Sequence, residues 1–428
     1  MLRLYNTALL PLRLGVELWA AMRARGADGR LEWAERLARR LPDVPAGGAW
    51  IHGASVGEVR IVRGLAARLR EERVRLPLAV SAYTASGRAQ LPAPPDVDAS
   101  FFVPLDFPGP TWRVLDALRP AVLVLIETEL WPNLLHAAGA GGVAVAIVNG
   151  RLSEERMLRY RRLARLYRPL LGRVAVVGAQ SEADAARFGE LGVPPRAISV
   201  TGNVKYDLPV PPLDPATLRD RLGLAARRPV FVAGSTAPGE EALVLDAFAI
   251  ARRAAPELLL VLAPRHVARA AEVAAVVAAR GLELVRYASP GTVGPRTAVL
   301  LIDTLGDLPA LYGLAALAFV GGSLTPVGGH NVLEPAVCGV PVLFGPHVDH
   351  FREPAEALLR SGGGRCLPEA AALGHEVTRL LADSAARHEM GRRAREVVEA
   401  NRGALERSVA LLLALLDARS PRPRPAAV

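Results

Sequence analysis

The chain has 428 residues, of which 51% are hydrophobic, 5% aromatic and 22% charged, and its formal net charge is +10 at pH 7. This apolar fraction excludes an intrinsically disordered protein, and the lack of any run of about 18–20 nearly uncharged apolar residues excludes a polytopic membrane protein. Two cysteines, Cys338 and Cys366, are too few for a disulfide framework or a four-thiolate zinc site and fit a reducing compartment. A chain of this length is expected to form two domains.

Residues 1–30 are predicted to form a membrane-associating segment. Met1 to Arg25 resembles a signal peptide, but Arg13 and Glu17 interrupt its apolar part and no small-residue cleavage pattern follows, so we expect it to be retained. An amphipathic helix that is apolar and flanked by arginines, yet too charged to span, is typical of the membrane interface. A helix packed on the protein's own core is the alternative.

Residues 31–207 are predicted to form an α/β domain with a parallel sheet. Short apolar runs that predict buried strands lie at 49–52, 78–81, 122–126, 144–148 and 174–178, and segments of helical period such as 59–70 and 113–118 lie between them. This alternation is typical of a parallel sheet covered on both faces. The proline-rich stretch Leu208–Leu213 then predicts a linker, which we place at 208–228.

The alternation restarts in residues 229–418, which are predicted to form the second domain. Strands are expected at 230–233, 258–263, 283–286, 298–302, 317–320 and 342–344, and helices at 240–254, 267–279, 375–381, 385–402 and 405–418. Residues 419–428, rich in proline and arginine, are predicted to be a disordered tail. Two doubly wound Rossmann-like domains leave a cleft at the carboxyl ends of their strands, where ligands of open α/β sheets bind.

Positive charge is concentrated between Arg151 and Arg173, where eight arginines accompany Glu154 and Glu155. Such an excess could serve nucleic acid, an anionic membrane surface or an acidic substrate. The chain also favours arginine over lysine generally, since Lys205 is its only lysine. A surface helix with a solvated arginine face is therefore the alternative.

The clearest glycine-rich signal is FVGGSLTPVGGHNVLEP at Phe319–Pro335. A strand is predicted to end at Gly321–Gly322, and Gly328–Gly329 precede a helix expected to open near Asn331. Glycines let a backbone approach a ligand closely, and a helix N-terminus favours a phosphate. Glu334 could accept hydrogen bonds from ribose hydroxyls. A turn that packs a helix on the sheet is the alternative.

Other predicted strand ends in the second half carry weaker signals. Ser235 lies in VAGSTAPGEE, which is also a good helix entry. Arg265 and His266 follow a buried strand, where a cation suits a phosphate leaving group. The loop at Leu305–Pro309 could present backbone groups to the edge of a base.

Acidic residues and the lone lysine mark the first half. Glu58 follows the predicted strand of WIHGASVGE at a helix start, where a carboxylate facing the cleft could take a proton from an attacking hydroxyl. Glu127 and Glu129 follow an apolar strand, and one of them could simply be buried and paired. Lys205 precedes the linker, and its retention suggests a task that arginine cannot perform, with chance as the alternative.

We expect neither a metal nor a cofactor. No Walker loop, zinc signature or G-x-S-x-G elbow is present. Asp96 and Asp98 form a D-x-D pattern in a proline-rich loop, not at a strand end. His347, Asp349 and His350 cluster without a fixed partner.

Together these segments resemble the bacterial 3-deoxy-D-manno-octulosonic acid (Kdo) transferases. The resemblance covers nearly the whole chain in order, through WIHGASVGE, ETELWPN, VNGRLSE, AQSEADAARF, GNVKYD, VAGSTAPGEE, APRH and FVGGSLTPVGGHNVLEPAVCGVPVLFGPH. It implies an inverting glycosyltransferase of the two-Rossmann-domain GT-B architecture, which attaches Kdo to lipid A precursor (lipid IVA) in lipopolysaccharide core biosynthesis. It also implies a peripheral or N-terminally anchored protein at the cytoplasmic face of the inner membrane.

The resemblance implies roles for particular residues. Glu58 would be the general base, and Glu127 and Lys205 would stabilise the transition state. The donor CMP-Kdo would be held by Ser235, Arg265, His266, Gly306, Asp307, Leu308, Gly322, Ser323, Gly329, His330, Asn331, Val332, Leu333 and Glu334. The acceptor and membrane side would include Ser55, Gly57, Arg151, Arg161, Arg165 and Arg168.

The segment Arg151–Leu171 would then face a bis-phosphorylated lipid in an anionic leaflet. At helical spacing it has an apolar face and a basic face, formed respectively by Tyr160, Leu163, Tyr167, Leu170 and Leu171, and by Arg161, Arg165 and Arg168.

The chain departs from the family pattern at a few positions. Ala237 stands where histidine is usual, so a donor contact from that side chain is absent. SAYTASG replaces a more threonine-rich segment, and Asp307 replaces a glutamate.

Two other functions are compatible with parts of the sequence. One is a GT-B glycosyltransferase or epimerase that uses a UDP- or GDP-sugar. The other is a membrane-bound RNA- or nucleotide-binding protein, although the arginine-rich segment lacks interleaved aromatic residues for base stacking and any RNA-module signature. We therefore expect no nucleic-acid partner.

Overall fold

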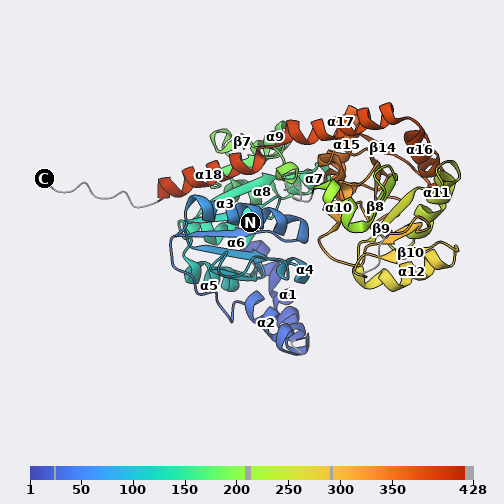
Figure 1. Ribbon diagram of the computed structural model, residues 1–428. Helices are drawn as coiled ribbons and strands as arrows, with labels where there is room; N and C mark the ends of the chain where they lie inside the picture. Colours follow the sequence, from blue (N-terminus) through green and yellow to red (C-terminus); the bar gives the residue numbers. More distant parts are fainter. Residues whose placement is uncertain (24–25, 208–213, 290–292, 420–428) are drawn as a thin grey trace. The chain divides into compact units, whose positions relative to one another are not determined.

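The computed structural model describes residues 1–23, 26–207, 214–289 and 293–419 (Figure 1). The chain divides into two compact units, which are described separately. Unit 1 comprises Met1–Asp207 and Arg402–Val428, and unit 2 comprises Leu208–Asn401. The predicted tail beyond Arg419 and the proline-rich stretch 208–213 lie outside the described residues.

Over the described part of unit 1, one seven-stranded parallel sheet has the order β3-β2-β1-β4-β5-β6-β7. Its strands are β1 (Ala49–His52), β2 (Leu78–Ala82), β3 (Ala99–Phe102), β4 (Val122–Ile126), β5 (Ala144–Gly150), β6 (Val176–Ala179) and β7 (Ile198–Val200). The helices are α1 (Leu2–Arg23), α2 (Gly26–Arg36), α3 (Val56–Glu72), α4 (Ala85–Arg88), α5 (Pro108–Leu118), α6 (Pro132–Ala140), α7 (Glu154–Arg162), α8 (Ala164–Leu171), α9 (Glu182–Glu190) and α18 (Ala404–Arg419), with 3-10 turns at η1 (Pro195–Ala197) and η2 (Val204–Asp207).

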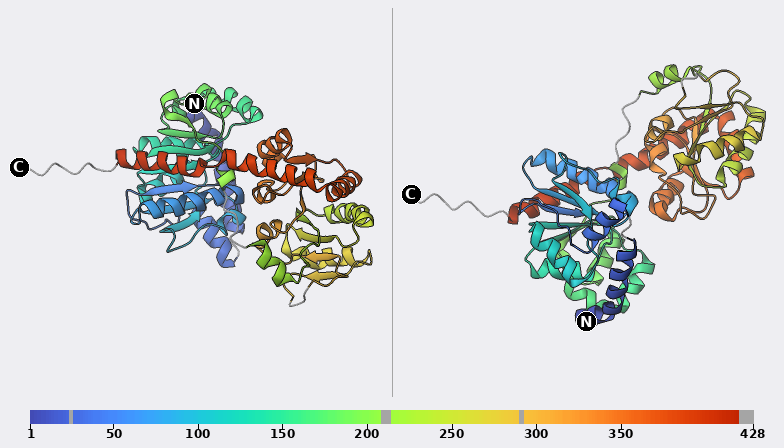
Figure 2. Two further views of the ribbon diagram at one scale, coloured as in Figure 1. Left: turned by 45° about the horizontal axis from the view of Figure 1, so that its top comes forward. Right: turned by 90° about the horizontal axis from the view of Figure 1, so that it is seen from below.

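Helices cover both faces of this sheet (Figure 2), so its central strands are buried throughout. Successive side chains of a strand point to opposite faces. Trp50 of β1 accordingly belongs to the core under α5, α6 and α8, whereas the neighbouring Ile51 belongs to the core under α3 and α18. This explains why continuous apolar runs mark the strands.

Over the described part of unit 2, a second seven-stranded parallel sheet has the order β10-β11-β9-β8-β12-β13-β14. Its strands are β8 (Val230–Thr236), β9 (Leu259–Pro264), β10 (Leu284–Arg286), β11 (Val299–Leu301), β12 (Leu317–Val320), β13 (Val342–Phe344) and β14 (Gly364–Cys366). The helices are α10 (Pro215–Leu222), α11 (Glu240–Ala254), α12 (Ala270–Ala278), α13 (Leu308–Tyr312), α14 (Leu333–Val337), α15 (Arg352–Ser361), α16 (Ala370–Ala382) and α17 (Ser384–Asn401), with 3-10 turns at η3 (Val267–Arg269) and η4 (Asp349–Phe351).

The prediction of two doubly wound α/β domains is confirmed, but the last helix was assigned to the wrong one. We placed it in the second domain (229–418), whereas α18 belongs to unit 1. Asp207 accepts hydrogen bonds from the backbone N–H groups of Gly403 and Leu405, both at 2.6 Å, and so fixes the start of α18. The apolar face of α18 then packs together with α3 in the core of unit 1.

The second half of the predicted linker is also folded. Asp214 accepts a hydrogen bond from the N–H of Thr217 at 3.1 Å and so caps α10. Leu218 and Leu222 of this helix pack in the core of unit 2. The linker predicted at 208–228 therefore includes a helix of the second unit.

Helix α1 packs in part on the core of unit 1, as one of the two alternatives for the N-terminus predicts, and the membrane location stays a prediction. Leu2 and Tyr5 pack against the core of unit 1, and the Tyr5 hydroxyl donates a hydrogen bond to Asp106 at 3.2 Å. Leu10 and Leu12, in contrast, are each 57% exposed. Helix α1 is thus attached to unit 1 and still leaves apolar side chains open to its surroundings.

Candidate functional site

The strand order of unit 1 reverses between β1 and β4, and open α/β sheets bind ligands at the carboxyl ends of strands next to such a reversal. Glu58 lies there, in the first turn of α3 after β1. Glu127 and Glu129 follow β4 directly. The structure therefore brings together the three glutamates that the sequence singled out in the first half.

Local contacts fix the Glu58 carboxylate. It accepts hydrogen bonds from the N–H of Ala54 at 2.8 Å and from the hydroxyl of Ser55 at 3.0 Å. Gly53 makes this arrangement possible, because a Cβ at that position would lie 3.1 Å from the Cβ of Glu58 and 2.9 Å from Val62. Gly57 is exposed in the same first turn.

The surroundings of Glu58 favour its protonated form. Burial, together with the negative charges of Glu127 and Glu129, raises the pKa of Glu58 to about 8. The two hydrogen bonds from Ala54 and Ser55 oppose this shift. A carboxyl group whose pKa lies near the working pH can both accept and release a proton, as a general base must.

Glu127 is paired with the only lysine of the chain. The Nζ atom of Lys205 lies 3.0 Å from Oε1 of Glu127, and the two side chains are only 15% and 18% exposed. Glu127 has a left-handed φ of +59°, a strained conformation that often occurs at functional sites. The ammonium group thus lies at the carboxyl edge of the sheet.

Two asparagines, which the sequence analysis did not single out, hold the segment that carries Lys205. Asn149 is the second-last residue of β5, has a φ of +57°, and accepts a hydrogen bond from the N–H of Val204 at 2.9 Å. Asn203 accepts one from the N–H of Lys205 at 3.0 Å. Both lie within the VNGRLSE and GNVKYD motifs, which were the available signal.

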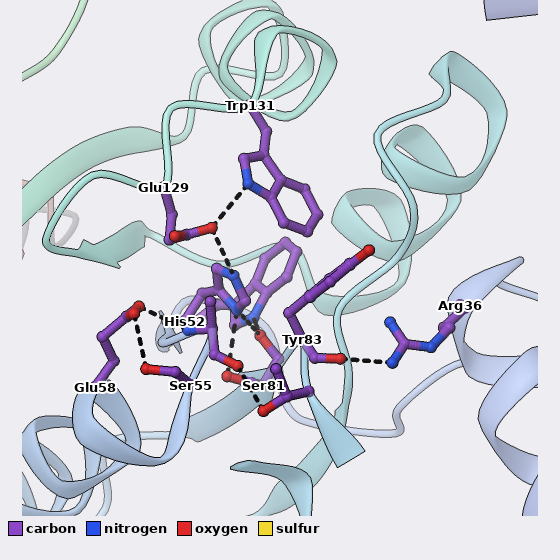
Figure 3. Close-up of polar contacts among 11 residues, drawn as sticks. Arg36, His52, Ser55, Glu58, Ser81, Tyr83, Glu129 and Trp131 are labelled. Carbon is purple, nitrogen blue, oxygen red and sulfur yellow. Dashed lines mark hydrogen bonds and ion pairs between the residues drawn. The ribbon is translucent and has the colours of Figure 1, made fainter. Parts of the chain in front are cut away.

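A pocket of about 730 Å³ opens beside this cluster, within unit 1. Its wall near the glutamates contains Glu129, Trp131 and Tyr83, and the rings of Trp131 and Tyr83 pack edge-on (Figure 3). The remaining lining residues come from α1, from the segment before α5, and from α6, α7 and α8: Tyr5, Leu105, Asp106, Pro132, Arg156, Arg159, Tyr160, Leu163 and Tyr167, together with Ala54, Thr128 and Leu130. The pocket therefore combines aromatic surface with two arginines.

These arginines are not the ones expected on the acceptor side. Arg156 and Arg159 line the pocket, whereas Arg161 makes a double contact with Glu190 at 2.6 and 2.9 Å. Arg165 and Arg168 are exposed outside the pocket lining, and Arg151 is partly buried, with its carbonyl accepting a hydrogen bond from Thr128. The single basic helix expected over Arg151–Leu171 is two helices, α7 and α8, that meet at Leu163.

In unit 2 the strand order reverses between β8 and β12, and most of the residues expected to hold the donor gather at that edge. Ser235 lies at the end of β8 with a left-handed φ of +57°. The other segments follow the adjacent strands: Arg265 and His266 follow β9, Gly306, Asp307 and Leu308 follow β11, and Gly322 and Ser323 follow β12.

The loop after β12 is held by a buried carboxylate that the sequence analysis placed only at a helix start. Glu240 has no solvent exposure and accepts hydrogen bonds from the N–H groups of Gly322, Ser323 and Leu324 at 2.5 to 2.9 Å. It also accepts one from the N–H of Ala237 at 2.8 Å. Glu240 therefore joins the strand ends of β8 and β12.

The segment 329–334 follows that loop. The ring of His330 lies over Gly322, and Asn331 accepts a hydrogen bond from the N–H of Leu333 at 3.1 Å. Asn331 also donates to Glu334 at 3.3 Å. The helix expected near Asn331 begins at Leu333, and the side chains of Val332, Leu333 and Ser323 are buried, so these three could offer a ligand only their backbone.

No group of three or more His, Cys, Asp or Glu residues that could hold a metal ion occurs in the part of the chain that the structure describes. The expectations that no metal or cofactor is needed, and that the two domains enclose a cleft, stay predictions.

Comparisons with known proteins agree on one family. A family model described as 3-deoxy-D-manno-octulosonic-acid transferase (kdotransferase) matches residues 31–208. The chain is 35% identical to a 3-deoxy-D-manno-octulosonic acid transferase of Bordetella pertussis, over 95% of this chain and 97% of the relative. It is 33% identical to the transferase of the same name from Haemophilus influenzae, over 87% and 88% of the two chains.

Among solved structures, the chain is similar in fold to a putative UDP-N-acetylglucosamine 2-epimerase from Listeria monocytogenes. The TM-score is 0.59 at 15% identity, over 90% of this chain and all of the other. Anabaena HepE, solved with UDP and glucose, gives a TM-score of 0.55 at 14% identity, over 86% and 99% of the two chains. These likenesses support the GT-B fold and, at such identities, nothing about the substrate.

Proposed function

The chain belongs to the 3-deoxy-D-manno-octulosonic acid (Kdo) transferase family, and from this membership we propose that it transfers Kdo from CMP-Kdo to a lipid A precursor in lipopolysaccharide biosynthesis. The observation that carries the proposal is the 35% identity to a Kdo transferase over nearly the full length of both chains. The position of Glu58 at the strand reversal of unit 1 supplies the chemistry.

Glu58 is proposed to be the general base. In its ionised form it would accept the proton of the acceptor hydroxyl as that oxygen attacks the anomeric carbon of Kdo, while the cytidylate phosphate leaves. The positive charge that develops on the sugar would be stabilised by the carboxylate of Glu127. Lys205 pairs with this carboxylate, its Nζ atom 3.0 Å from Oε1 of Glu127.

The pocket beside Glu58 is proposed to receive the acceptor. Arg156 and Arg159 carry the charge and the donor groups that recognise a phosphate. Tyr83, Tyr160 and Trp131 offer flat surfaces for the sugar and the start of its acyl chains. The donor is proposed to bind unit 2 at the segments that follow β8, β9, β11 and β12.

Unit 1 is proposed to lie on the inner-membrane surface at its cytoplasmic face. No described helix is long and apolar enough to cross a bilayer. Helix α1 instead exposes Leu4, Leu10 and Leu12 next to the pocket that Tyr5 lines, and α7 exposes Leu158 at 55% beside the arginines. Apolar side chains flanked by arginines are the pattern of interfacial membrane binding.

Membrane binding is tested by sedimentation with vesicles that contain phosphatidylglycerol. The double substitution Leu10→Asp and Leu12→Asp is expected to release the protein from the vesicles. Leu359→Asp, on a 41% exposed leucine of unit 2, is the matched control and is expected to leave binding intact. Equal binding of all three proteins would contradict the proposed surface.

The transferase activity is tested by incubation with CMP-Kdo and tetraacylated lipid A precursor, with the product mass showing whether Kdo has been added. Glu58→Gln is expected to lower turnover by about 10²–10⁴-fold while CMP binding is retained. Transfer from a UDP- or GDP-sugar but not from CMP-Kdo would instead support the alternative transferase. Wild-type turnover in Glu58→Gln would refute the assignment of the base.

A further inference from the structure

A histidine that the proposed reaction does not use lies buried behind Glu58 (Figure 3). His52 is the last residue of β1 and has no solvent exposure. Its Nδ1 atom lies 3.2 Å from the carbonyl oxygen of Ser81 and 3.0 Å from the hydroxyl of the same residue. Because a carbonyl oxygen can only accept, we assign the ring proton to Nδ1, which leaves a lone pair on Nε2.

That lone pair has no hydrogen-bond donor among the residues that the structure describes. A buried acceptor without a donor is destabilising, because it has lost its hydrogen bond to water. Oε2 of Glu129 lies 4.0 Å away. An ionised Glu129 could only accept, whereas a protonated Glu129 could donate to Nε2 after a small movement of its side chain.

Trp131 adds a second contact to Glu129. Its indole N–H donates to Oε2 of Glu129 at 2.8 Å, and its ring packs edge-on against His52 and against Tyr83, with centroids 5.4 and 5.5 Å apart. One carboxyl group thus lies between the buried imidazole and an aromatic wall of the pocket. The orientation of that wall depends on Glu129.

The charges that face Glu129 come from several elements. Arg156 of α7 is the cation and Glu127 is the anion, and Glu58 of α3 is a further titratable carboxyl group whose raised pKa favours its neutral form. Burial is the main cause that raises the pKa of Glu129, and the charge of Glu127 adds to it, while the Trp131 hydrogen bond and Arg156 oppose it. Burial lowers the pKa of His52 to about 4, so the imidazole is neutral at neutral pH.

We propose that Glu129 is a positioning residue that works as a neutral carboxylic acid, donating its proton in a hydrogen bond to Nε2 of His52 while it accepts the indole N–H of Trp131. The pair would hold Trp131 in place at the wall of the pocket. It would also keep one negative charge away from Glu58, whose own ionisation the charge of Glu129 opposes. The inference rests on the proposed transferase function for its effect on the rate, although not for the protonation itself.

Two substitutions separate a neutral acid from a carboxylate. Both groups lie next to Oε2 of Glu129, so glutamine at position 129 can donate its amide N–H to His52 and accept from Trp131 through its carbonyl oxygen only after its amide group turns, whereas alanine can do neither. Glu129→Ala is expected to lower kcat/KM for Kdo transfer by about 10–100-fold through loss of positioning. Glu129→Gln is expected to be at least about tenfold more active than Glu129→Ala.

Equal losses in both variants would show that the charge of the carboxylate is required, and would overturn the proposal. Wild-type rates in both variants would overturn it as well, because Glu129 would then position nothing. Thermal unfolding of the two variants shows whether a loss of rate follows from a loss of folded protein.

The protonation is tested separately by nitrogen NMR of the full chain with ¹⁵N-labelled histidine, with the signals of His52 assigned by their loss in His52→Gln. We expect a neutral ring at pH 7 that carries its proton on Nδ1. We also expect an Nε2 signal that moves toward the unbonded position in Glu129→Ala and stays near the wild-type position in Glu129→Gln. A protonated Nε2 at pH 7 would overturn the proposal, even if the protein transferred no Kdo.

Discussion

Raising the pH from 7 to 9 is expected to increase kcat/KM for Kdo transfer about tenfold, because Glu58 must be ionised to accept a proton. Burial is the main cause that raises the pKa of Glu58 to about 8, and the charge of Glu127 adds to it, as would a charge on Glu129. With this pKa, roughly one tenth of the carboxyl groups are ionised at pH 7, one half at pH 8 and nine tenths at pH 9. The rate should follow this fraction and level off above pH 9.

The measurement is the initial rate at low concentrations of CMP-Kdo and acceptor across pH 6 to 9.5, with the product quantified by mass. Phosphate groups of the substrates have a second pKa of about 6, so their titration ends before the rise that Glu58 predicts. The substitution Glu127→Gln removes one of the charges that raise the pKa of Glu58. It should therefore move the rise to lower pH, whatever it does to the maximal rate.

A matched control is Glu399→Gln, which removes a carboxylate from the exposed surface of α17 in unit 2, where Glu399 forms an ion pair with Arg395 at 2.8 Å. This substitution should leave the midpoint of the rise unchanged. A rate that is flat between pH 6 and 9, or a midpoint that Glu127→Gln does not lower, would refute the environment assigned to Glu58.

Substitutions at Lys205, Glu240 and Asp207, with Asp417 as a control, test contacts that support the two units. Lys205→Met leaves the carboxylate of Glu127 without its ammonium partner and should lower kcat. Lys205→Arg should restore little of that kcat, because a planar guanidinium differs from an ammonium in shape. Steady-state kinetics check both variants. Glu240→Ala removes the acceptor of four backbone N–H groups. It should lower the free energy of unfolding, measured by urea titration, by about 3 kcal/mol or more. A loss below about 1 kcal/mol would contradict the role of Glu240. Asp207→Ala removes the anchor of α18 and should cost about 1–2 kcal/mol, whereas Asp417→Ala, on a 65% exposed side chain of the same helix, should cost less than about 0.5 kcal/mol.

The central strands could be predicted from the sequence because helices bury both of their faces, which leaves continuous apolar runs such as Val122–Ile126. Three of the four strands at the edges of the sheets, β3, β7 and β14, give no such run. Two of the four residues of β3 (Ala99–Phe102) are only partly buried. In β7 (Ile198–Val200) one residue is partly buried and the other two are exposed, and in β14 (Gly364–Cys366) two of the three residues are exposed. Polar and small residues are tolerated where one side of a strand faces solvent, so these strands resemble loops in sequence.

The residues of the candidate site could be found one by one from local motifs, but their partners could not. Glu58 stands out as a glutamate at a helix start, yet its high pKa arises from burial in the fold and from the charge of Glu127, 69 residues further along, which the order of β1 and β4 places beside it. In the same way, neighbouring sequence placed α18 in the second domain, while contacts with Asp207, 196 and 198 residues away, attach it to the first. Motifs identify the groups that can do chemistry, and the strand order decides which of them meet. Asn149 of β5 holds the segment that carries Lys205 by accepting a hydrogen bond from Val204. A substitution of Asn149 should therefore disturb the site as much as a substitution within the GNVKYD motif itself.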